Sequence, residues 1–233
     1  MANISVASGQ GVHVQTLSDQ VLNAVVLAVM ERRIPFGARL KEAEIARDLN
    51  VSRMPVREAL MRLVSEGVVT NTPFRGMCLM EVDERKLREI LDVRVSLERL
   101  AFQAAIERLI SGEETLNRVE SALLEMERAC SDGSAALMAH SDIGYHRSVV
   151  ELSGNETLRN LWEMMARQFQ MIVGIAWHVT DQQAIYQSHV DLHTAIAEMD
   201  QAKVHEMLAP HIMEAMSFGL GDLASGTNGA TKT

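Results

Sequence analysis

The residues best suited to chemistry lie in the second half of the sequence, where an aspartate and several histidines recur at helical spacing. Asp142 and His146 are four residues apart, as are His189 and His193, so each pair would share one face of a helix. His211 follows in a later segment. Imidazole and carboxylate groups together suit zinc, nickel, manganese or iron. The sequence therefore predicts a divalent metal site, with zinc as the first expectation, against the alternative that each histidine is an ordinary surface or core residue.

Two enzyme classes that use such ligands have no support in the sequence. A helical di-iron carboxylate enzyme needs Glu-x-x-His pairs, and a zinc protease of the common helical type needs His-Glu-x-x-His. Neither pattern occurs in the chain. We therefore expect no catalytic residues, and a helical metalloenzyme is the least favoured alternative. A purely structural metal stays open beside a metal that takes part in ligand binding.

A second group of chemically capable residues consists of arginines near the N-terminus. Arg53 and Arg57 are four residues apart, so they share one face at the start of a predicted helix. A guanidinium fork matches the paired acceptors of guanine or a phosphate oxygen. Arg75 and Gly76 lie in a turn between two predicted strands, from which Arg75 could reach a groove of DNA. The alternative is a solvated helix whose arginines pair with Glu58.

A reading helix must position these arginines. Asn50 tolerates the left-handed backbone of a tight turn, and Ser52 and Pro55 suit the first residues of a helix. Apolar residues recur behind the arginines and predict the buried face of this helix: Val56, Leu60 and Leu63. A helix from Thr16 or Ser18 to about residue 32, a helix over 42–49 and strands over 68–72 and 77–81 complete a winged helix-turn-helix.

The metal-type residues fall in a region that is helical throughout. Apolar stripes predict six helices, over 83–109, 111–129, 135–152, 156–178, 181–199 and 201–218. Ser111 and Glu114 form the pattern of a capping box that opens the second of these. The inward residues are expected to include Leu17 of the N-terminal helix, Val93 and Leu100 of the first bundle helix, and Leu161 of the fourth.

The expected fold is mainly α, with a winged helix-turn-helix before an antiparallel six-helix bundle. We place the DNA-binding domain at residues 1–81, with a disordered N-terminal arm. The helical domain spans 82–219, and a disordered tail covers 220–233.

The charge distribution separates a DNA-binding region from an acidic remainder. The chain of 233 residues carries a net charge of −9, which by itself argues against nucleic acid. Nine basic and five acidic residues lie between Arg32 and Arg75, so this segment carries +4 and the rest of the chain −13. Positive charge is therefore concentrated where contact with phosphates requires it.

No stretch of the sequence predicts a membrane or secreted protein. No apolar run approaches the roughly 18 residues of a membrane span, and residues 1–11 lack the basic and apolar regions of a secretion signal. Cys78 and Cys130 provide neither a disulfide framework nor a Cys-x-x-Cys zinc motif. We therefore expect a cytoplasmic protein with no membrane partner.

The N-terminal motif also resembles a known family. The run from Ser52 to Leu60, with Leu63, Glu66-Gly67 and Arg75-Gly76, is similar to the DNA-binding signature of the GntR family of bacterial transcription regulators. The resemblance implies DNA contacts from the following residues: Arg53, Met54, Arg57, Arg75 and Gly76. Met54 stands where the family usually has threonine, so one expected hydroxyl contact is missing. A homodimer on a pseudo-palindromic double-stranded operator is expected.

The helical half resembles the FCD effector domain of FadR-type GntR regulators, in its metal-binding, VanR-like form. The resemblance rests on 142–146 followed by Ser153-Gly154-Asn155, and on His189, Asp200 and His211 at intervals of eleven. It implies four metal ligands: Asp142, His146, His189 and His211. His193 is the rival of His189, and the register with Asp200 favours His189.

Arg94 is the residue that the resemblance directs toward the ligand cavity. A metal with an open coordination position beside a guanidinium would receive a carboxylate, with one oxygen on each. The alternative role of Arg94 is a salt bridge with Glu98, four residues later. The sequence therefore predicts a DNA-binding transcription regulator, expected to be a repressor, whose operator affinity responds to a small organic acid.

Overall fold

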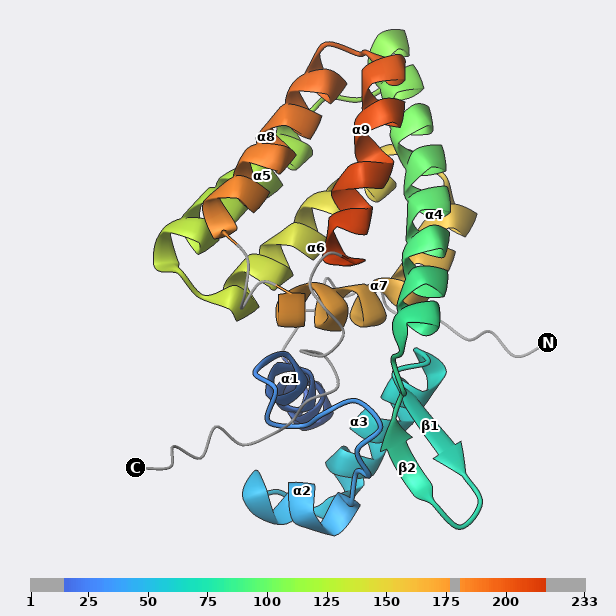
Figure 1. Cartoon of the computed structure of the whole chain (residues 1–233), viewed down its shortest axis with the longest axis vertical. Helices are drawn as coiled ribbons and strands as arrows, with labels where there is room; N and C mark the ends of the chain where they lie inside the picture. The colour runs from blue at the N-terminus through green and yellow to red at the C-terminus, as the bar shows by residue number, and fades with distance from the viewer. Residues whose placement is uncertain (1–14, 177–180, 217–233) are drawn as a thin grey trace, which may run out of the picture.

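The computed structural model describes residues 15–176 and 181–216 of the chain. Within these ranges the chain forms nine α-helices, one short 3-10 helix and a two-stranded sheet. Figure 1 shows two lobes, with the blue and teal N-terminal elements below a larger lobe built from helices alone. The predicted mainly α fold, a winged helix-turn-helix before a six-helix bundle, is confirmed. The boundary at residue 81 stays a prediction, and the predicted arm and tail lie outside the described residues.

Local signals explain the N-terminal lobe. The Thr16 hydroxyl accepts a hydrogen bond from the Asp19 amide, and the Asp19 carboxylate accepts one from the Thr16 amide, which together start the first helix. Asn50 takes φ +52° in the turn before the reading helix. The strands pair antiparallel, with Val69 opposite Leu79. The elements are α1 (Leu17–Met30), α2 (Glu42–Asp48), α3 (Arg53–Ser65), β1 (Val69–Thr72) and β2 (Gly76–Leu79).

The packing of α1 against α3 forms the core of this lobe. The predicted inward face of α3 is fully buried: Val56, Leu60 and Leu63. Leu17, predicted to point inward, is instead 47% exposed because the buried stretch of α1 begins only at Val21. Ser52 directly precedes α3, but its side chain makes no capping hydrogen bond.

The C-terminal lobe is a bundle of six helices. Its elements are α4 (Glu84–Ser111), α5 (Asn117–Asp132), α6 (Ala135–Leu152), α7 (Glu156–Ala176), α8 (Gln182–Ala197), α9 (Gln201–Met213) and a 3-10 turn (Glu214–Met216). α6 contacts α4, α5 and α7, and α9 packs against α4 and α8 (Figure 1). The largest fully buried side chains of this lobe are Trp162, Tyr145, Phe102 and Phe169. Among the described helices, none is long and apolar enough to cross a membrane.

The buried face of α4 differs from the predicted one. Val93 and Leu100 are 43% and 51% exposed, and Leu161 of α7 is 50% exposed. The predicted Leu87, Ile90 and Leu91 are buried, but the next inward positions of α4 are taken by Arg94 and Glu98, which are 2% and 0% exposed. These two charged side chains satisfy each other inside the bundle, so the apolar residues beside them turn outward.

The predicted capping box between the first two bundle helices is wrong. Ser111 still belongs to α4, and its hydroxyl donates to the Arg108 carbonyl. Gly112 ends the helix at φ +74°, a conformation that favours glycine. Glu114 pairs with Arg108, 3.3 Å away, and α5 begins only at Asn117. The predicted end of α7 at 178 lies outside the described residues, whereas α9, predicted to continue to 218, ends at Met213 and gives way to a 3-10 turn.

The two lobes meet at α7, which lies directly above α1 in Figure 1. Gln168 of α7 donates a hydrogen bond of 2.9 Å to the carbonyl of Glu66, the residue that ends α3. Arg167 pairs with the Glu66 carboxylate at 3.2 Å. Met30 of α1 packs so closely on Gly174 that a Cβ there would lie 2.5 Å from the Met30 sulfur. The reading domain is therefore docked on one helix of the bundle.

Candidate metal centre and DNA-reading surface

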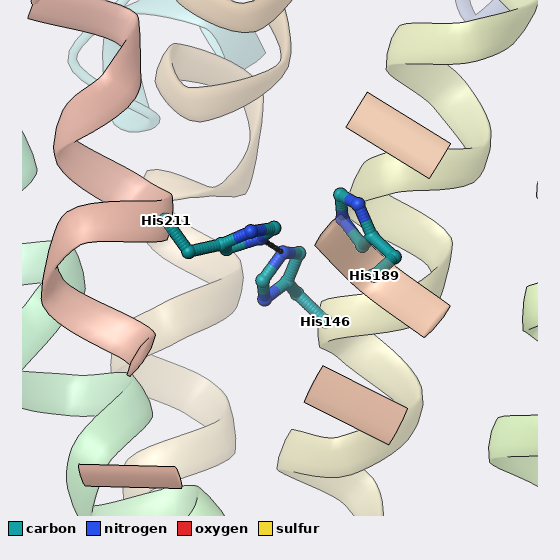
Figure 2. Close-up of side chains that lie close together, drawn as sticks. All are labelled: His146, His189 and His211. Carbon is teal, nitrogen blue, oxygen red and sulfur yellow. Dashed lines mark hydrogen bonds between the residues drawn. The ribbon is translucent and has the colours of Figure 1, made fainter. Parts of the chain in front are cut away.

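Three helices of the bundle bring three histidines together. His146 comes from α6, His189 from α8 and His211 from α9 (Figure 2). Each offers one nitrogen such that the three atoms lie within 4.8 Å of one another. The Nε2 atoms of His146 and His211 are 3.2 Å apart, and the rings of His189 and His211 are separated by 4.4 Å between centroids. His146 and His189 are fully buried.

Asp142 lies at the same place, one turn before His146 on α6. Its Oδ2 atom is 3.3 Å from Nε2 of His189, and the side chain is almost fully buried. Burial would raise the pKa of Asp142, but the contact with the His189 ring and the Arg94 charge outweigh it and lower that pKa, which keeps the carboxylate ionised. The structure thus brings together all four residues that the sequence singled out as metal ligands.

A polar partner at the opposite ring nitrogen orients each imidazole, through a hydrogen bond for His189 and His211 and through a close carboxylate contact for His146. Nδ1 of His146 lies 2.6 Å from Glu98 Oε2, Nδ1 of His189 lies 2.9 Å from the Ile185 carbonyl, and Nδ1 of His211 lies 2.7 Å from Ser188 Oγ. The carbonyl and the carboxylate can only accept, so these Nδ1 atoms of His189 and His146 carry the proton. Their Nε2 lone pairs therefore point into the cluster, as metal ligands require.

The cluster carries an excess of lone pairs that a cation would satisfy. Nε2 of His189 is buried and makes no directed hydrogen bond within the described residues, although a carboxylate oxygen of Asp142 is 3.3 Å away. Burial, first of all, lowers the pKa of both His146 and His211, so these rings are neutral rather than cationic. Two unprotonated nitrogens and a carboxylate facing one another fit a bound metal ion.

Glu98 is a residue of the site whose role the sequence reasoning missed. It accepts hydrogen bonds from Arg94 Nε at 2.8 Å and from Trp162 Nε1 at 3.0 Å, in addition to its contact with His146. Burial opposes its ionisation, but the charge of Arg94 and the close contact with the His146 ring outweigh burial and lower the Glu98 pKa to about 2. Its position four residues after Arg94 on the inward face was the available signal.

Arg94 forms the salt bridge that the sequence left open and also lies beside the candidate metal centre. Its salt bridge with Glu98 is present, and its Nη2 atom lies 3.4 Å from Asp142 Oδ1. It also lines a cavity of about 10 Å³ together with Asp142, Ser188 and His211. Such a volume holds about one water molecule. The guanidinium is therefore next to the candidate metal centre, but the space beside it is small.

His193 lies outside the histidine cluster. It is one turn beyond His189 on α8 and half-buried, and its ring centroid is 6.4 Å from that of Tyr145. The structure therefore places His189, and not His193, among the other candidate ligands.

We expect Glu98→Gln to weaken metal binding by about 10–100-fold, because the amide provides less negative charge to polarise His146. Competition with a chromophoric chelator measures the affinity. Glu151→Gln is the matched control, since Glu151 lies on α6, away from the cluster, and pairs with Arg118 at 2.6 Å. Equal affinity of the wild type and Glu98→Gln would contradict the orienting role of Glu98.

The candidate DNA-reading residues are exposed at the start of α3. Arg53, Met54 and Arg57 all face solvent, with Met54 71% exposed. Within the described part of the chain neither Arg53 nor Arg57 has an ion pair, so the pairing with Glu58 that the sequence left open is not formed. Both guanidinium groups are free to contact a groove.

The wing presents a third arginine. Arg75 follows the hairpin tip, its side chain is 72% exposed, and its nearest carboxylate, that of Glu81, is 3.6 Å away. Gly76 starts β2 at φ +73°, which explains why glycine occupies this position. Phe74 at the tip is fully exposed. The wing and α3 are thus two neighbouring surfaces with available cationic groups.

Both lobes of the chain match known protein families. Residues 17–78 match the model for bacterial regulatory proteins of the gntR family, and residues 89–214 match the model for the FCD domain. The chain is similar to the "Probable D-xylose utilization operon transcriptional repressor" of Paenarthrobacter nicotinovorans, with 26% identity over 197 residues, 84% of this chain and 86% of the relative. It is also similar to the Nta operon transcriptional regulator of Aminobacter aminovorans, with 28% identity over 178 residues, 76% of this chain and 82% of the relative.

A solved structure shows the same fold. McbR/YncC of Escherichia coli superposes with a TM-score of 0.67 at 24% identity, over 88% of this chain and 97% of that one. The FCD match alone spans more than half of the chain. An FCD domain binds effectors, and a gntR-type domain binds DNA, so the prediction of a regulator rather than an enzyme is confirmed. The chain therefore belongs to the GntR family of bacterial transcription regulators, and its C-terminal half is an FCD domain.

Proposed function

We propose that this regulator is a homodimeric repressor whose operator affinity is set by a small carboxylate bound at a divalent metal. The observation that carries the proposal is the convergence of three imidazole nitrogens and the Asp142 carboxylate beside the buried guanidinium of Arg94. The proposed metal ligands are Asp142, His146, His189 and His211. One of the relatives is named as a repressor of a D-xylose utilization operon, which accords with control by a metabolite.

The proposed metal is zinc, with nickel, manganese or iron as alternatives. Three nitrogens and one oxygen suit all four ions, and a position for a ligand is open when the ion binds more than four ligands, as zinc does when it becomes five-coordinate. At that position the metal would bind one oxygen of a carboxylate. The second oxygen would accept from Arg94, whose planar fork is suited to carboxylates. Arg94 stays ionised for this role, because Glu98 and Asp142 raise its pKa against the effect of burial.

Helix α7 connects the candidate metal centre to the reading domain, in addition to the covalent link between the two lobes. Trp162 of α7 donates to Glu98, and the Phe169 ring lies 5.4 Å from the Arg94 guanidinium. Gln168, the neighbour of Phe169 on α7, donates a hydrogen bond to the carbonyl of Glu66 at the end of α3. A ligand that shifts Arg94 would therefore act on the helix that holds the reading domain, in addition to the covalent link at 80–83. By linkage, DNA must then shift ligand affinity by the same factor.

The proposed dimer would be formed through the helical domain. α4 and α7 pack on each other and expose four large apolar side chains: Val93, Leu100, Leu161 and Met164. Such exposure is typical of a surface that a second copy covers. Two reading domains related by a two-fold axis would match a pseudo-palindromic operator in the bacterial cytoplasm.

Calorimetry of organic acids with the metal-loaded protein tests whether a carboxylate effector binds beside Arg94. Arg94→Lys keeps the charge that Glu98 and Asp142 need but removes the fork, so we expect acid affinity to fall by roughly 10–100-fold. Metal content should not change. Arg88→Lys, on the exposed side of α4, is the control and should bind acids like the wild type.

A purely structural metal is the second candidate, and one observation favours it. The cavity beside Arg94 measures only about 10 Å³, so no effector fits without a local rearrangement. Under this alternative, a broad panel of mono-, di- and tricarboxylates would show no binding, or binding that is indifferent to Arg94→Lys. Either result would remove the effector and leave the metal a role in stability.

A further inference from the structure

A larger groove lies directly outside the candidate metal centre. It measures about 640 Å³, lies between α8 and α9, and has a mostly apolar wall formed by Leu192, Met207, Pro210 and Met213. Pockets for small organic molecules typically measure about 300–1,000 Å³. The groove therefore has the size of a ligand site, whereas the inner cavity at Arg94 does not.

The groove and the inner cavity share three lining residues: Ser188, His211 and Glu214. Of these, Ser188 and His211 are joined by the hydrogen bond of 2.7 Å between Ser188 Oγ and His211 Nδ1. A molecule in the groove is thus separated from Arg94 and Asp142 by this hydrogen-bonded pair. A ligand that reaches both spaces must pass beside it.

The last turn of α9 lies between the groove and the inner cavity, and the helix is weakened there. Pro210 lies inside the helix and has no N–H, so the carbonyl of Glu206 lacks its regular helical bond. Beyond it, Ile212 and Ala215 close the inner cavity, and the α-helix gives way to a 3-10 turn at Glu214. A small movement of this turn would join the two spaces.

We propose that the effector is a monocarboxylic acid with an apolar extension, an inference that rests on the proposed function. Its carboxylate occupies the inner cavity beside Arg94, and its chain lies in the groove between α8 and α9. The apolar wall stabilises a hydrocarbon, and the acidic side chain of Glu206, which lines the groove but not the inner cavity, repels further carboxylates. Compact di- and tricarboxylates are therefore disfavoured.

Calorimetry with acetate, butyrate, hexanoate, octanoate and citrate against the metal-loaded full chain tests this inference. We expect affinity to rise roughly fourfold for each added methylene until the groove is filled, and citrate to bind less tightly than octanoate. Met207→Gln should weaken octanoate several-fold and leave acetate unchanged, so acetate reports on the integrity of the site. Met61→Gln, the same change on the reading helix, is the control and should have no effect.

The outcomes separate this inference from the proposed function. If acids bind in an Arg94-dependent manner but without regard to chain length or to Met207→Gln, the groove is not used and the proposed function stands. Tighter binding of citrate than of octanoate would also overturn the inference. If none of the acids binds, the effector proposal itself fails and the inference fails with it.

Discussion

His146→Ala and His211→Ala are each expected to reduce the bound divalent metal from about one ion per chain to almost none. Each substitution removes an inward-facing Nε2 and leaves at most three protein ligands in a buried site. Metal analysis of the purified protein by mass spectrometry measures the content. His205→Ala is the control, because His205 lies exposed on α9, in the helix that carries His211. Wild-type metal content in both variants would contradict the assigned centre.

The sharper comparison is between two histidines on α8. His189→Ala should lose the metal, since Nε2 of His189 is 3.3 Å from Asp142. His193→Ala should keep it, because His193 is half-buried and lies outside the cluster. The reverse result would shift the ligand assignment on this helix by one turn.

Arg53→Ala and Arg57→Ala should each weaken operator binding by ~1–3 kcal/mol if the side chain contacts a base edge. Both guanidinium groups are exposed at the N-terminus of α3 and unpaired among the described residues, so their removal should leave the fold intact. Fluorescence anisotropy across a salt series, with an operator selected from random-sequence duplexes, measures the change. A smaller salt slope would identify a phosphate contact instead.

Arg62→Ala is the matched control for this surface. Arg62 lies two turns further along α3, where its guanidinium is engaged by Asp19 of α1. We expect it to change operator affinity far less than the two arginines at the helix start. If Arg53→Ala and Arg57→Ala both bind like the wild type with unchanged salt dependence, α3 does not read the operator in the way assigned.

Helical periodicity predicted most of the architecture because apolar residues dominate the buried faces. It located α3 by Val56, Leu60 and Leu63, all fully buried. It failed on the middle of α4, where Arg94 and Glu98 are buried and Val93 turns outward. Hydrophobicity does not reveal that two charged residues satisfy each other, since this depends on partners from α6 and α7.

The candidate metal ligands could be predicted from the sequence, but the residues that surround them could not. Spacing placed Asp142 and His146 on one face, and the family resemblance selected His189 over His193. The role of Glu98 was missed, because it depends on the simultaneous approach of Arg94, His146 and Trp162 from three helices. Contacts that connect segments far apart in the chain leave no local pattern, and the docking of Gln168 on α3 is a further example.

The most direct measurement is operator affinity of the metal-loaded protein with and without the acid that binds most tightly in calorimetry. We expect a change of about 5–150-fold, which corresponds to typical coupling free energies. We also expect an equal change in acid affinity when operator is present, and no response after the metal is removed. An acid that binds through Arg94 but leaves operator affinity unchanged would contradict the claim that this site controls DNA binding.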